Sequence, residues 1–224
     1  MWEGSRAMKL HWSPRSPFVR KVMIVAHETG LVGRIECVRT VVAATAPHAG
    51  LMRENPLSKL PTLVLDDGTA VYDSRVICEY LDTLHAGARL FPARFPERLV
   101  ALRRQALGDG MLDFLLLWVG ERGRPPAQQS APHLAAYRAK LGASLAVLEE
   151  EAEALGEGPF GIGQIGVGTA LCYLDFRFTG EEWRRGCPGL AAWHEGFAAR
   201  ASVRATAPVD DTDAPMEAPV FSSP

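Results

Sequence analysis

The first third of the chain changes its hydrophobic period several times. Residues 9–12, Lys-Leu-His-Trp, are a candidate for a short strand. From Pro17 the apolar residues recur three and four positions apart, which predicts a helix, and Gly30 is a typical residue to end it. The β-branched stretch 35–42 predicts a second strand. A strand, a helix and a strand in this order predict a βαβ unit with a parallel pair of strands.

A hairpin and another helix are predicted to follow. Residues 43–58 are rich in Ala, Pro and Asn and predict a loop. The stretches 60–65 and 70–72 predict two strands joined by a turn at 66–69, because an Asp-Gly pair suits positive φ. The next helix should bury four residues, Ile77, Tyr80, Leu81 and Leu84. Together these elements predict one four-stranded mixed sheet with helices packed on it.

The rest of the chain has a helical period throughout. Residues 87–96 break the pattern and predict a linker between a first domain, 8–86, and an all-α second domain, 97–206. Residues 207–224, rich in Pro, Ala and Asp, predict a disordered tail. Helices are predicted over three ranges and after one proline: 99–119, 134–148, 162–178 and the residues that follow Pro188.

One of these helices is apolar nearly all round. Residues 162–178 therefore predict a helix buried in the core of the second domain. Its three glycines each cost a helix roughly 1 kcal/mol relative to alanine, so they predict close helix packing or a later helix start. They are Gly163, Gly166 and Gly168. Three consecutive glutamates, 149–151, near the end of the preceding helix predict a solvated face.

Composition narrows the class of protein. The chain has 224 residues, 47% hydrophobic and 22% charged, with a formal net charge of −2. This balance gives no electrostatic reason to bind nucleic acid or an anionic membrane surface. No apolar run approaches the roughly 20 residues that span a bilayer. Residues 1–7 lack the apolar core of a signal peptide, and Met8 is an alternative start.

Cysteines and histidines give no metal or disulfide pattern. The four cysteines, Cys37, Cys78, Cys172 and Cys187, are scattered without a repeated spacing. Free thiols in a reducing cytoplasm explain them better than a disulfide framework or a zinc site. The six histidines form no HxxxH or HExxH pattern. We therefore predict a cytoplasmic protein without a metal.

A Ser-Pro pair begins the first predicted helix. Ser16 can accept hydrogen bonds from the first turn, and Pro17 loses nothing there by lacking an N–H. Free backbone N–H groups and the helix dipole would also stabilise an anion beside the Ser16 hydroxyl. On this stretch alone a simple helix cap is the better interpretation. Ser13, which directly follows the strand, is a rival for any role in binding an anion.

Three segments of the first domain should meet along one edge of its sheet: Ser16, Lys59-Leu60-Pro61 and Asp73-Ser74. The pattern resembles the thioredoxin fold and, more closely, the N-terminal domain of glutathione S-transferases. Residues 16–20, Ser-Pro-Phe-Val-Arg, are similar to the Cys-Pro-Tyr-Cys start of glutaredoxins. Residues 55–63 resemble the family's NPxxKxPxL signature, and residues 72–81 resemble its helix start. The predicted helical domain matches the family's C-terminal domain, so the resemblance covers roughly residues 8–205.

The resemblance implies roles for Ser16, Leu60 and Pro61. Ser16 would donate a hydrogen bond to the glutathione sulfur and favour its thiolate. Pro61 would be cis and would present the Leu60 backbone to the cysteinyl backbone of glutathione. The alternative is a trans Pro61 that marks the edge of a strand.

The resemblance also implies contacts with the charged ends of glutathione. Asp73 would face the γ-glutamyl ammonium, and Ser74, at a helix N-terminus, would bind the γ-glutamyl carboxylate. Lys59 would reach the glycine carboxylate. Each has a simpler alternative, because Asp73-Ser74 also forms a helix cap and Lys59 also reads as a surface lysine.

The family's electrophile pocket would combine residues of both domains. The candidates are Trp12, Arg15, Met111, Phe114, Leu115 and Trp118. The alternative for the aromatic and methionine stripe is plain core. Two departures from the family pattern matter. Serine at position 16 argues against disulfide reduction through an enzyme thiol, and Gly161 and Gln164 replace the usual capping box of the buried helix.

The resemblance implies a bacterial, homodimeric glutathione transferase-like enzyme with a role in detoxification. Bound glutathione thiolate, as co-substrate, would attack a small hydrophobic electrophile, with no metal and no second cofactor. The alternative is a non-catalytic binding or regulatory protein of the same fold. A disulfide oxidoreductase is the third option, which the missing cysteine disfavours.

Overall fold

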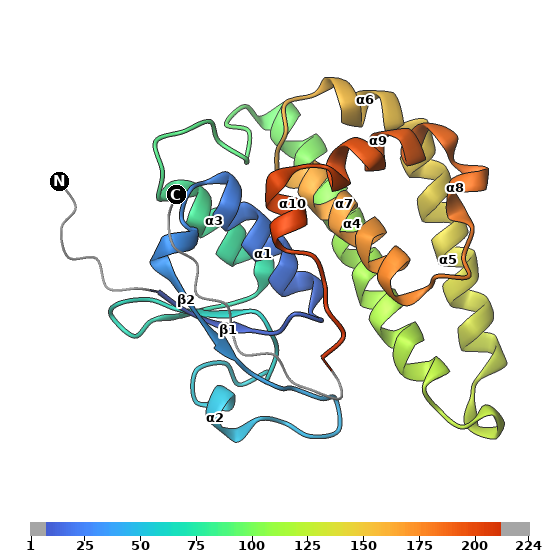
Figure 1. The fold of residues 1–224 in the computed structure, drawn as a ribbon, viewed down its shortest axis with the longest axis horizontal. Helices are drawn as coiled ribbons and strands as arrows, with labels where there is room; N and C mark the ends of the chain where they lie inside the picture. The colour runs from blue at the N-terminus through green and yellow to red at the C-terminus, as the bar shows by residue number, and fades with distance from the viewer. Residues whose placement is uncertain (1–7, 212–224) are drawn as a thin grey trace. The chain divides into compact units, whose positions relative to one another are not determined.

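A computed structural model describes residues 8–211 of the chain (Figure 1). These residues divide into two compact units. The first comprises residues 8–91 together with 205–211, and the second comprises residues 92–204. Residues 1–7 and 212–224 lie outside the described residues, and with them most of the predicted tail.

The first unit begins with the predicted βαβ arrangement. Strand β1, Met8–Trp12, pairs in parallel with β2, Ile35–Arg39. The helix between them, α1, Pro17–Glu28, has Ser16 as its N-cap and proline at its first position. Gly30 follows the helix with φ +70°, in the left-handed region that glycine tolerates best. A short 3₁₀ turn, η1, Val32–Arg34, then leads into β2.

The hairpin completes a mixed sheet of order β2-β1-β3-β4, as predicted. Strand β3, Thr62–Val64, is antiparallel to β1, and β4, Ala70–Val71, is antiparallel to β3. Gly68 in the turn has φ +86°, and the Leu65 N–H donates to the Thr69 carbonyl. Both strands are shorter than predicted. Strand β3 begins only after Pro61, which has no N–H to pair, and β4 ends at Val71, which pairs with Leu63.

The predicted loop 43–58 contains one turn of helix that the sequence pattern did not reveal. Helix α2 covers Ala49–Met52, and its N-cap is His48, whose Nδ1 accepts a hydrogen bond from the Leu51 N–H at 2.9 Å. Leu51 is fully buried and anchors the turn. The expectation of a continuous loop was wrong because the cap is a histidine, outside the usual Ser, Thr, Asp and Asn set.

Helix α3, Ser74–Thr83, packs against α1, and the two stand together beside the sheet (Figure 1). Its buried apolar residues are Ile77, Cys78 and Leu81. Tyr80 and Leu84, which we expected to be buried, are half-buried instead. The buried stripe is therefore rotated toward Cys78, a small apolar residue that fits close to the neighbouring helix.

The buried carboxylate of Asp82 binds the segment that leads out of the first unit. Asp82 on α3 accepts hydrogen bonds from the backbone N–H groups of Leu90 at 2.8 Å and Phe91 at 3.2 Å. His85 Nε2 lies 3.1 Å from the same carboxylate, and Asp82 is only 4% exposed. These contacts hold the chain that leads out of the unit.

Asp82→Ala should lower the free energy of unfolding by about 2 kcal/mol, because it removes the carboxylate that accepts from two buried backbone N–H groups. Asp82→Asn keeps one carbonyl oxygen and should cost about half as much. Urea unfolding followed by circular dichroism measures both. Equal stability of the alanine variant and the wild type would show that water replaces the carboxylate at no cost.

The second unit is helical throughout its described residues, as predicted. Its main helices are α4, Phe95–Arg122, α5, Ala131–Glu150, α6, Ala152–Glu157, α7, Ile162–Arg177, α8, Trp183–Gly186, and α9, Pro188–Ala198. A 3₁₀ turn, η2, Pro126–Gln128, lies between α4 and α5, and α10, Ala201–Ala205, leads back to the first unit.

The close packing predicted for the glycines of α7 occurs where α7 meets α4. A Cβ on Gly166 would lie 2.9 Å from the Gln105 Cα, and one on Gly108 of α4 would lie 2.4 Å from the Gly166 carbonyl carbon. The N-cap of α7 is Gly161, without a side-chain hydrogen bond, as the sequence indicates. Gln164 instead donates from Nε2 to the Pro159 carbonyl at 2.9 Å.

Glu150 is exposed as expected, but Glu149 and Glu151 are not part of a solvated face. Glu149 accepts hydrogen bonds from the N–H groups of Gly189 and Leu190, at the start of α9. Glu151 forms ion pairs with Arg103 and Arg104. Burial raises the pKa of the Glu151 carboxyl, but the two arginines outweigh it, so the net pKa lies below the usual value. The partners are far away in the sequence, so no local pattern could have predicted them.

The C-terminal segment 205–211 belongs to the first unit. The Val209 N–H donates to the Pro14 carbonyl at 3.3 Å. The Asp211 carboxylate is buried and accepts hydrogen bonds from Arg39, the shorter at 2.7 Å, and lies 3.0 Å from Arg15 Nε. We refer to Arg15, Arg39 and Asp211 as the C-terminal clasp.

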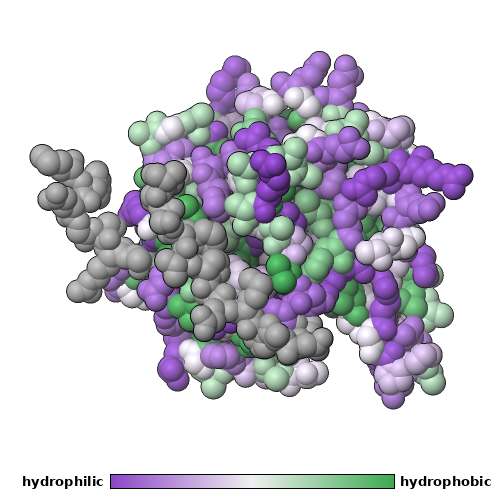
Figure 2. Space-filling view, in the orientation of Figure 1, coloured by the Kyte–Doolittle hydropathy of each residue, from purple (hydrophilic) through white to green (hydrophobic). Residues whose placement is uncertain are grey.

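The surface carries both hydrophilic and apolar side chains. On the face drawn in Figure 2, hydrophilic side chains predominate and apolar ones are interspersed. This agrees with the mean hydropathy of the chain, which is close to zero. Between residues 8 and 211, no helix combines the length and the apolar character that crossing a membrane requires.

Candidate ligand-binding site

The sheet register brings the three predicted segments to one edge. His11 pairs with Thr62, so the end of β1 lies beside the start of β3. Leu63 pairs with Val71, so the end of β4 lies there too. The segments that follow or precede these strands therefore meet, as predicted. We call this place the Ser16 edge; it comprises Ser16, Lys59–Pro61 and Asp73–Ser74.

Ser16 caps α1, and its hydroxyl can still donate a hydrogen bond. Its Oγ accepts a hydrogen bond from the Val19 N–H at 3.3 Å, and its carbonyl accepts one from Arg20. A hydroxyl has one donor and two acceptor positions, so capping leaves its proton available for another acceptor. The half-buried side chain also lies at the positive end of the helix dipole.

Ser13, the rival of Ser16, is placed differently. It is 8% exposed, and its Oγ accepts from the Arg15 N–H at 3.4 Å. Its carbonyl accepts from the Ser16 N–H at 3.2 Å, so Ser13 begins the turn that leads into the helix. It is not the residue that caps α1.

The Leu60–Pro61 peptide bond is cis, as predicted. Asn55, 1% exposed, holds the chain on both sides of it. Its Nδ2 donates to the Lys59 carbonyl at 3.2 Å and to Thr62 Oγ1 at 2.9 Å. Within residues 8–211 the Leu60 N–H and C=O make no hydrogen bond, which leaves a strand-like pair of groups for a ligand. The Lys59 side chain is exposed.

Asp73 and Ser74 begin α3 together. Asp73 is the N-cap, and its Oδ1 accepts a hydrogen bond from the Arg75 N–H at 2.9 Å. The carboxylate is exposed, and its second oxygen remains open to a cationic partner. Ser74, the first helical residue, is only 2% exposed. The predicted cap is therefore present, and it leaves groups that a zwitterionic ligand can use.

A charged cluster that we did not predict supports this edge. Glu54, next to Asn55, pairs with Lys9 and with His11 Nε2, and His11 Nδ1 lies 2.8 Å from Thr40 Oγ1. Burial raises the pKa of the Glu54 carboxyl, but hydrogen bonds from Lys9 and His11 outweigh it, so the net pKa is lowered. The cluster ties the loop before Pro61 to β1. Its signal in the sequence was the polar pair Lys9 and His11, two positions apart on one face of a strand.

Two of the candidate electrophile residues belong to the first unit and four to the second. In the first unit Trp12 is 7% exposed, and Arg15 is part of the C-terminal clasp. In the second unit Trp118 lies against Tyr137 and Phe178, with ring centroids 6.2 and 4.7 Å away. The other three candidates of that unit lie on α4 and are also buried: Met111, Phe114 and Leu115.

The described residues, 8–211, contain no group of three His, Cys, Asp or Glu side chains close enough together to hold a metal ion. The Ser16 edge instead offers hydroxyls, backbone groups, a carboxylate and helix N-termini. Such groups suit a small peptide-like ligand with both charges and a group that can become an anion.

Family models match both units. Residues 15–84 match the glutathione S-transferase N-terminal domain, and residues 131–196 match the glutathione S-transferase C-terminal domain. The chain is 34% identical over 203 residues to an uncharacterised GST-like protein of Escherichia coli K12, YibF, and the match covers 90% of this chain and 98% of that protein.

Solved structures agree with these matches. A glutathione transferase family member from Pseudomonas fluorescens Pf-5, with bound glutathione, is 41% identical, with a TM-score of 0.88. The match covers 91% of this chain and all of that one. A glutathione S-transferase from Methylobacillus flagellatus KT, also with glutathione bound, is 34% identical with a TM-score of 0.81, and the coverage is again 91% and 100%.

Proposed function

This chain belongs to the glutathione S-transferase family, and from that premise we propose that it binds glutathione at the Ser16 edge and promotes attack of the thiolate on a small hydrophobic electrophile. The observation that supports this most is the convergence of three segments with unused hydrogen-bonding groups at one edge of a thioredoxin-like sheet. The relatives from Pseudomonas and Methylobacillus that bind glutathione support the same ligand.

Each part of glutathione has a complementary group in this proposal. The cysteinyl backbone pairs with the free N–H and C=O of Leu60 as a short strand would. The γ-glutamyl carboxylate binds at the N-terminus of α3 beside Ser74, and its ammonium faces Asp73. The glycine carboxylate is within the reach of the exposed Lys59 side chain.

The chemical step depends on the thiolate. A free thiol has a pKa of roughly 8.5, so it is mostly protonated at neutral pH. A hydrogen bond from the Ser16 hydroxyl and the positive end of the α1 dipole both stabilise the anion, which is the nucleophile. Attack on the electrophile needs neither a metal nor a second cofactor in this mechanism.

The electrophile and the biological setting are further parts of the proposal. We propose that the residues that select a hydrophobic electrophile are Trp12 and Arg15 in the first unit and Met111, Phe114, Leu115 and Trp118 in the second. Four free cysteines support a reducing, cytoplasmic setting. Family resemblance supports a homodimer and a role in detoxification.

Calorimetry with glutathione tests the binding proposal. Wild-type protein should bind glutathione, and Asp73→Ala should weaken binding about tenfold, equivalent to about 1.4 kcal/mol, because it removes a charged partner of the ammonium. Asp73→Asn keeps an oxygen that can cap α3 but loses the charge, so it should weaken binding by a similar factor.

Asp67→Ala provides the matched control. Asp67 also accepts a backbone hydrogen bond in a turn, from the Thr69 N–H at 2.8 Å, but it lies in the β3–β4 hairpin away from the Ser16 edge. Its removal should leave the affinity unchanged. Absence of binding by the wild type would overturn the proposal. Binding without conjugation of any electrophile would favour the non-catalytic alternative.

A further inference from the structure

A thiol and an imidazole meet in the second unit, apart from the proposed glutathione site. Cys172 on α7 lies with its Sγ 3.4 Å from Nε2 of His194 on α9. His194 is 3% exposed, and its ring packs against Trp183 and Phe197. Cys172 is half-buried, so its thiol is not sealed in the core.

The surroundings of His194 determine which nitrogen carries the proton. Arg184 Nη2 lies 3.3 Å from His194 Nδ1, and an arginine can only donate. The Asp175 carboxylate also lies near this nitrogen, with Oδ2 3.9 Å from Nδ1. A neutral imidazole that accepts from Arg184 at Nδ1 and a protonated imidazolium both carry a proton on Nε2, where it points to Cys172. Arg184 is itself held by two hydrogen bonds to Asp175, at 2.7 and 2.6 Å.

This arrangement favours the thiolate of Cys172. An N–H that donates to sulfur stabilises the anion more than the neutral thiol. The Arg184 guanidinium, close to His194, adds positive charge nearby, and Asp175 offsets part of it. Asp175 is anionic, because burial raises its pKa but Arg184 and Trp183 lower it further. The thiolate is the reactive form in exchange with disulfides.

The other three cysteines differ from Cys172 in burial or in the pKa of the thiol. Cys78 is fully buried. Burial raises the pKa of the Cys37 thiol to about 12. Burial and the nearby Glu149 carboxylate raise the pKa of Cys187, whose thiol lies 3.9 Å from the Leu145 carbonyl. Cys37 and Cys187, whose thiol pKa is raised, therefore serve as controls for the thiol beside His194.

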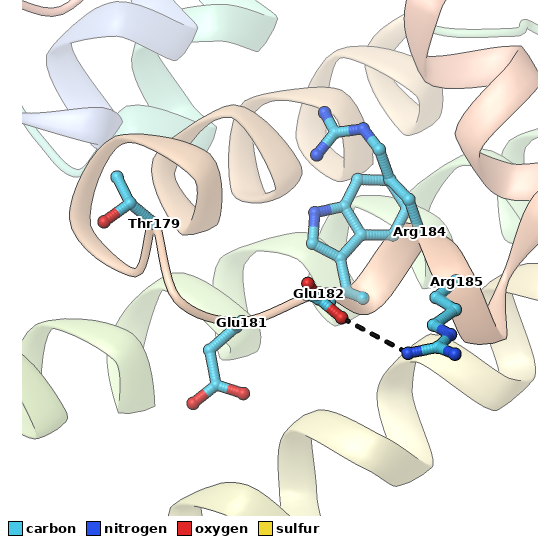
Figure 3. A pocket seen from close by; sticks show the side chains of 6 residues that line it. Thr179, Glu181, Glu182, Arg184 and Arg185 are labelled. Atoms are coloured by element: carbon cyan, nitrogen blue, oxygen red, sulfur yellow. Dashed lines mark ion pairs between the residues drawn. The ribbon is translucent and has the colours of Figure 1, made fainter.

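A pocket of about 540 Å³ adjoins the cluster formed by Cys172, Asp175, Arg184 and His194 (Figure 3). It is lined by Thr179, Glu181, Glu182, Trp183, Arg184 and Arg185. Trp183 and Arg184 connect it to the cluster, since both donate to Asp175 and Arg184 also contacts His194. Figure 3 shows Glu182 and Arg185 facing one another, so both signs of charge are available to a small zwitterionic molecule.

We propose that Cys172 is a site of thiol modification, which forms a mixed disulfide with a low-molecular-weight disulfide such as oxidised glutathione. The Cys172 thiol loses its proton to solvent, and the thiolate attacks one sulfur of the disulfide. A bond from Sγ to that sulfur forms, the original S–S bond breaks, and the other half leaves as a thiolate that takes up a proton. The Cys172 thiolate supplies the electron pair of the new S–S bond, and the pair of the old bond leaves with the departing thiolate, so no further oxidant is needed.

Mass spectrometry of the whole chain tests the inference. The reduced protein is incubated with oxidised glutathione at neutral pH, and the adduct is located by peptide mapping. One adduct should form, on Cys172, at least about tenfold faster than on Cys37 or Cys187. Cys172→Ser should abolish it, and Cys187→Ser should not change it. First modification of another cysteine, or no adduct at all, would overturn the inference.

A pair of substitutions at His194 separates packing from hydrogen bonding. His194→Phe keeps a ring against Trp183 and Phe197 but removes the N–H, and the modification rate should fall about tenfold. His194→Gln can place an amide N–H near the former Nε2 and should recover most of the rate. A His194→Phe variant that is modified as fast as the wild type would show that His194 does not activate the thiol. If His194→Phe fails to fold, the glutamine variant decides: modification of its Cys172 no faster than that of Cys187 would show the same.

A second disulfide makes the result independent of glutathione binding. Hydroxyethyl disulfide carries no glutathione moiety, and it should modify the same cysteine. Failure of the Ser16 edge to bind glutathione would therefore leave this reaction unaffected, whereas failure of Cys172 to react with both disulfides overturns the present inference alone.

Discussion

Gly108→Ala is expected to destabilise the second unit by about 3 kcal/mol, the upper part of the usual range for overpacking. The new Cβ would lie 2.4 Å from both the carbonyl carbon and the carbonyl oxygen of Gly166. These are backbone atoms of α7, so no side-chain rotation can relieve the contact. The two helices must move apart, and the apolar residues packed between them would lose contacts.

Gly110→Ala is the matched control on the same helix. A Cβ at Gly110 meets nothing within 4 Å, and the residue is exposed. The same chemical change should therefore stabilise the protein by about 1 kcal/mol, through helix propensity alone. Urea unfolding of both variants measures the difference. Effects of the same sign would mean that α4 and α7 are not in close backbone contact.

Ser16→Ala should lower kcat/KM for conjugation of a chloronitroaromatic electrophile by about 100-fold, a typical loss when one donor to a reacting anion is removed. The glutathione thiol would lose the hydroxyl that stabilises its anion. The same substitution removes the N-cap of α1 and should cost about 1 kcal/mol of stability. Initial-rate kinetics measure the first effect, and thermal unfolding measures the second.

Two further variants separate the cap from the donor. Ser16→Asp can still cap α1, but its carboxylate has no proton to donate and repels a thiolate, so activity should fall at least as far as in Ser16→Ala. Ser13→Ala removes only the acceptor of a weak turn contact and should leave the rate near that of the wild type. A large loss in Ser13→Ala with full activity in Ser16→Ala would assign the donor to Ser13.

Much of the first unit could be predicted because its signals are local. Pro17 and Gly30 mark the ends of one helix, and Asp67-Gly68 marks a hairpin, each through backbone preferences that neighbours hardly change. The one-turn helix α2 escaped prediction because its stability comes from the burial of Leu51 in the tertiary structure. Propensity alone is a weak guide for so short an element.

The candidate site also combines residues with local sequence signals and residues that only the tertiary structure reveals. Ser16 and Asp73 were predictable as caps because a cap depends on residues within one helical turn. The contacts that hold the site in place were not. Glu54 reaches Lys9, and Asn55 reaches Thr62, through a fold that a linear pattern does not encode. Supporting residues of this kind are found only when distant segments are seen together.

The C-terminal clasp makes the first unit discontinuous in the chain, and this has a consequence for biosynthesis. Arg15 and Arg39 are translated before the helical unit, whereas Asp211 is translated after it. At about 5–20 residues per second, the two arginines wait on the order of ten seconds for their carboxylate. For that time the nascent sheet lacks the Asp211 carboxylate that binds both arginines in the finished fold.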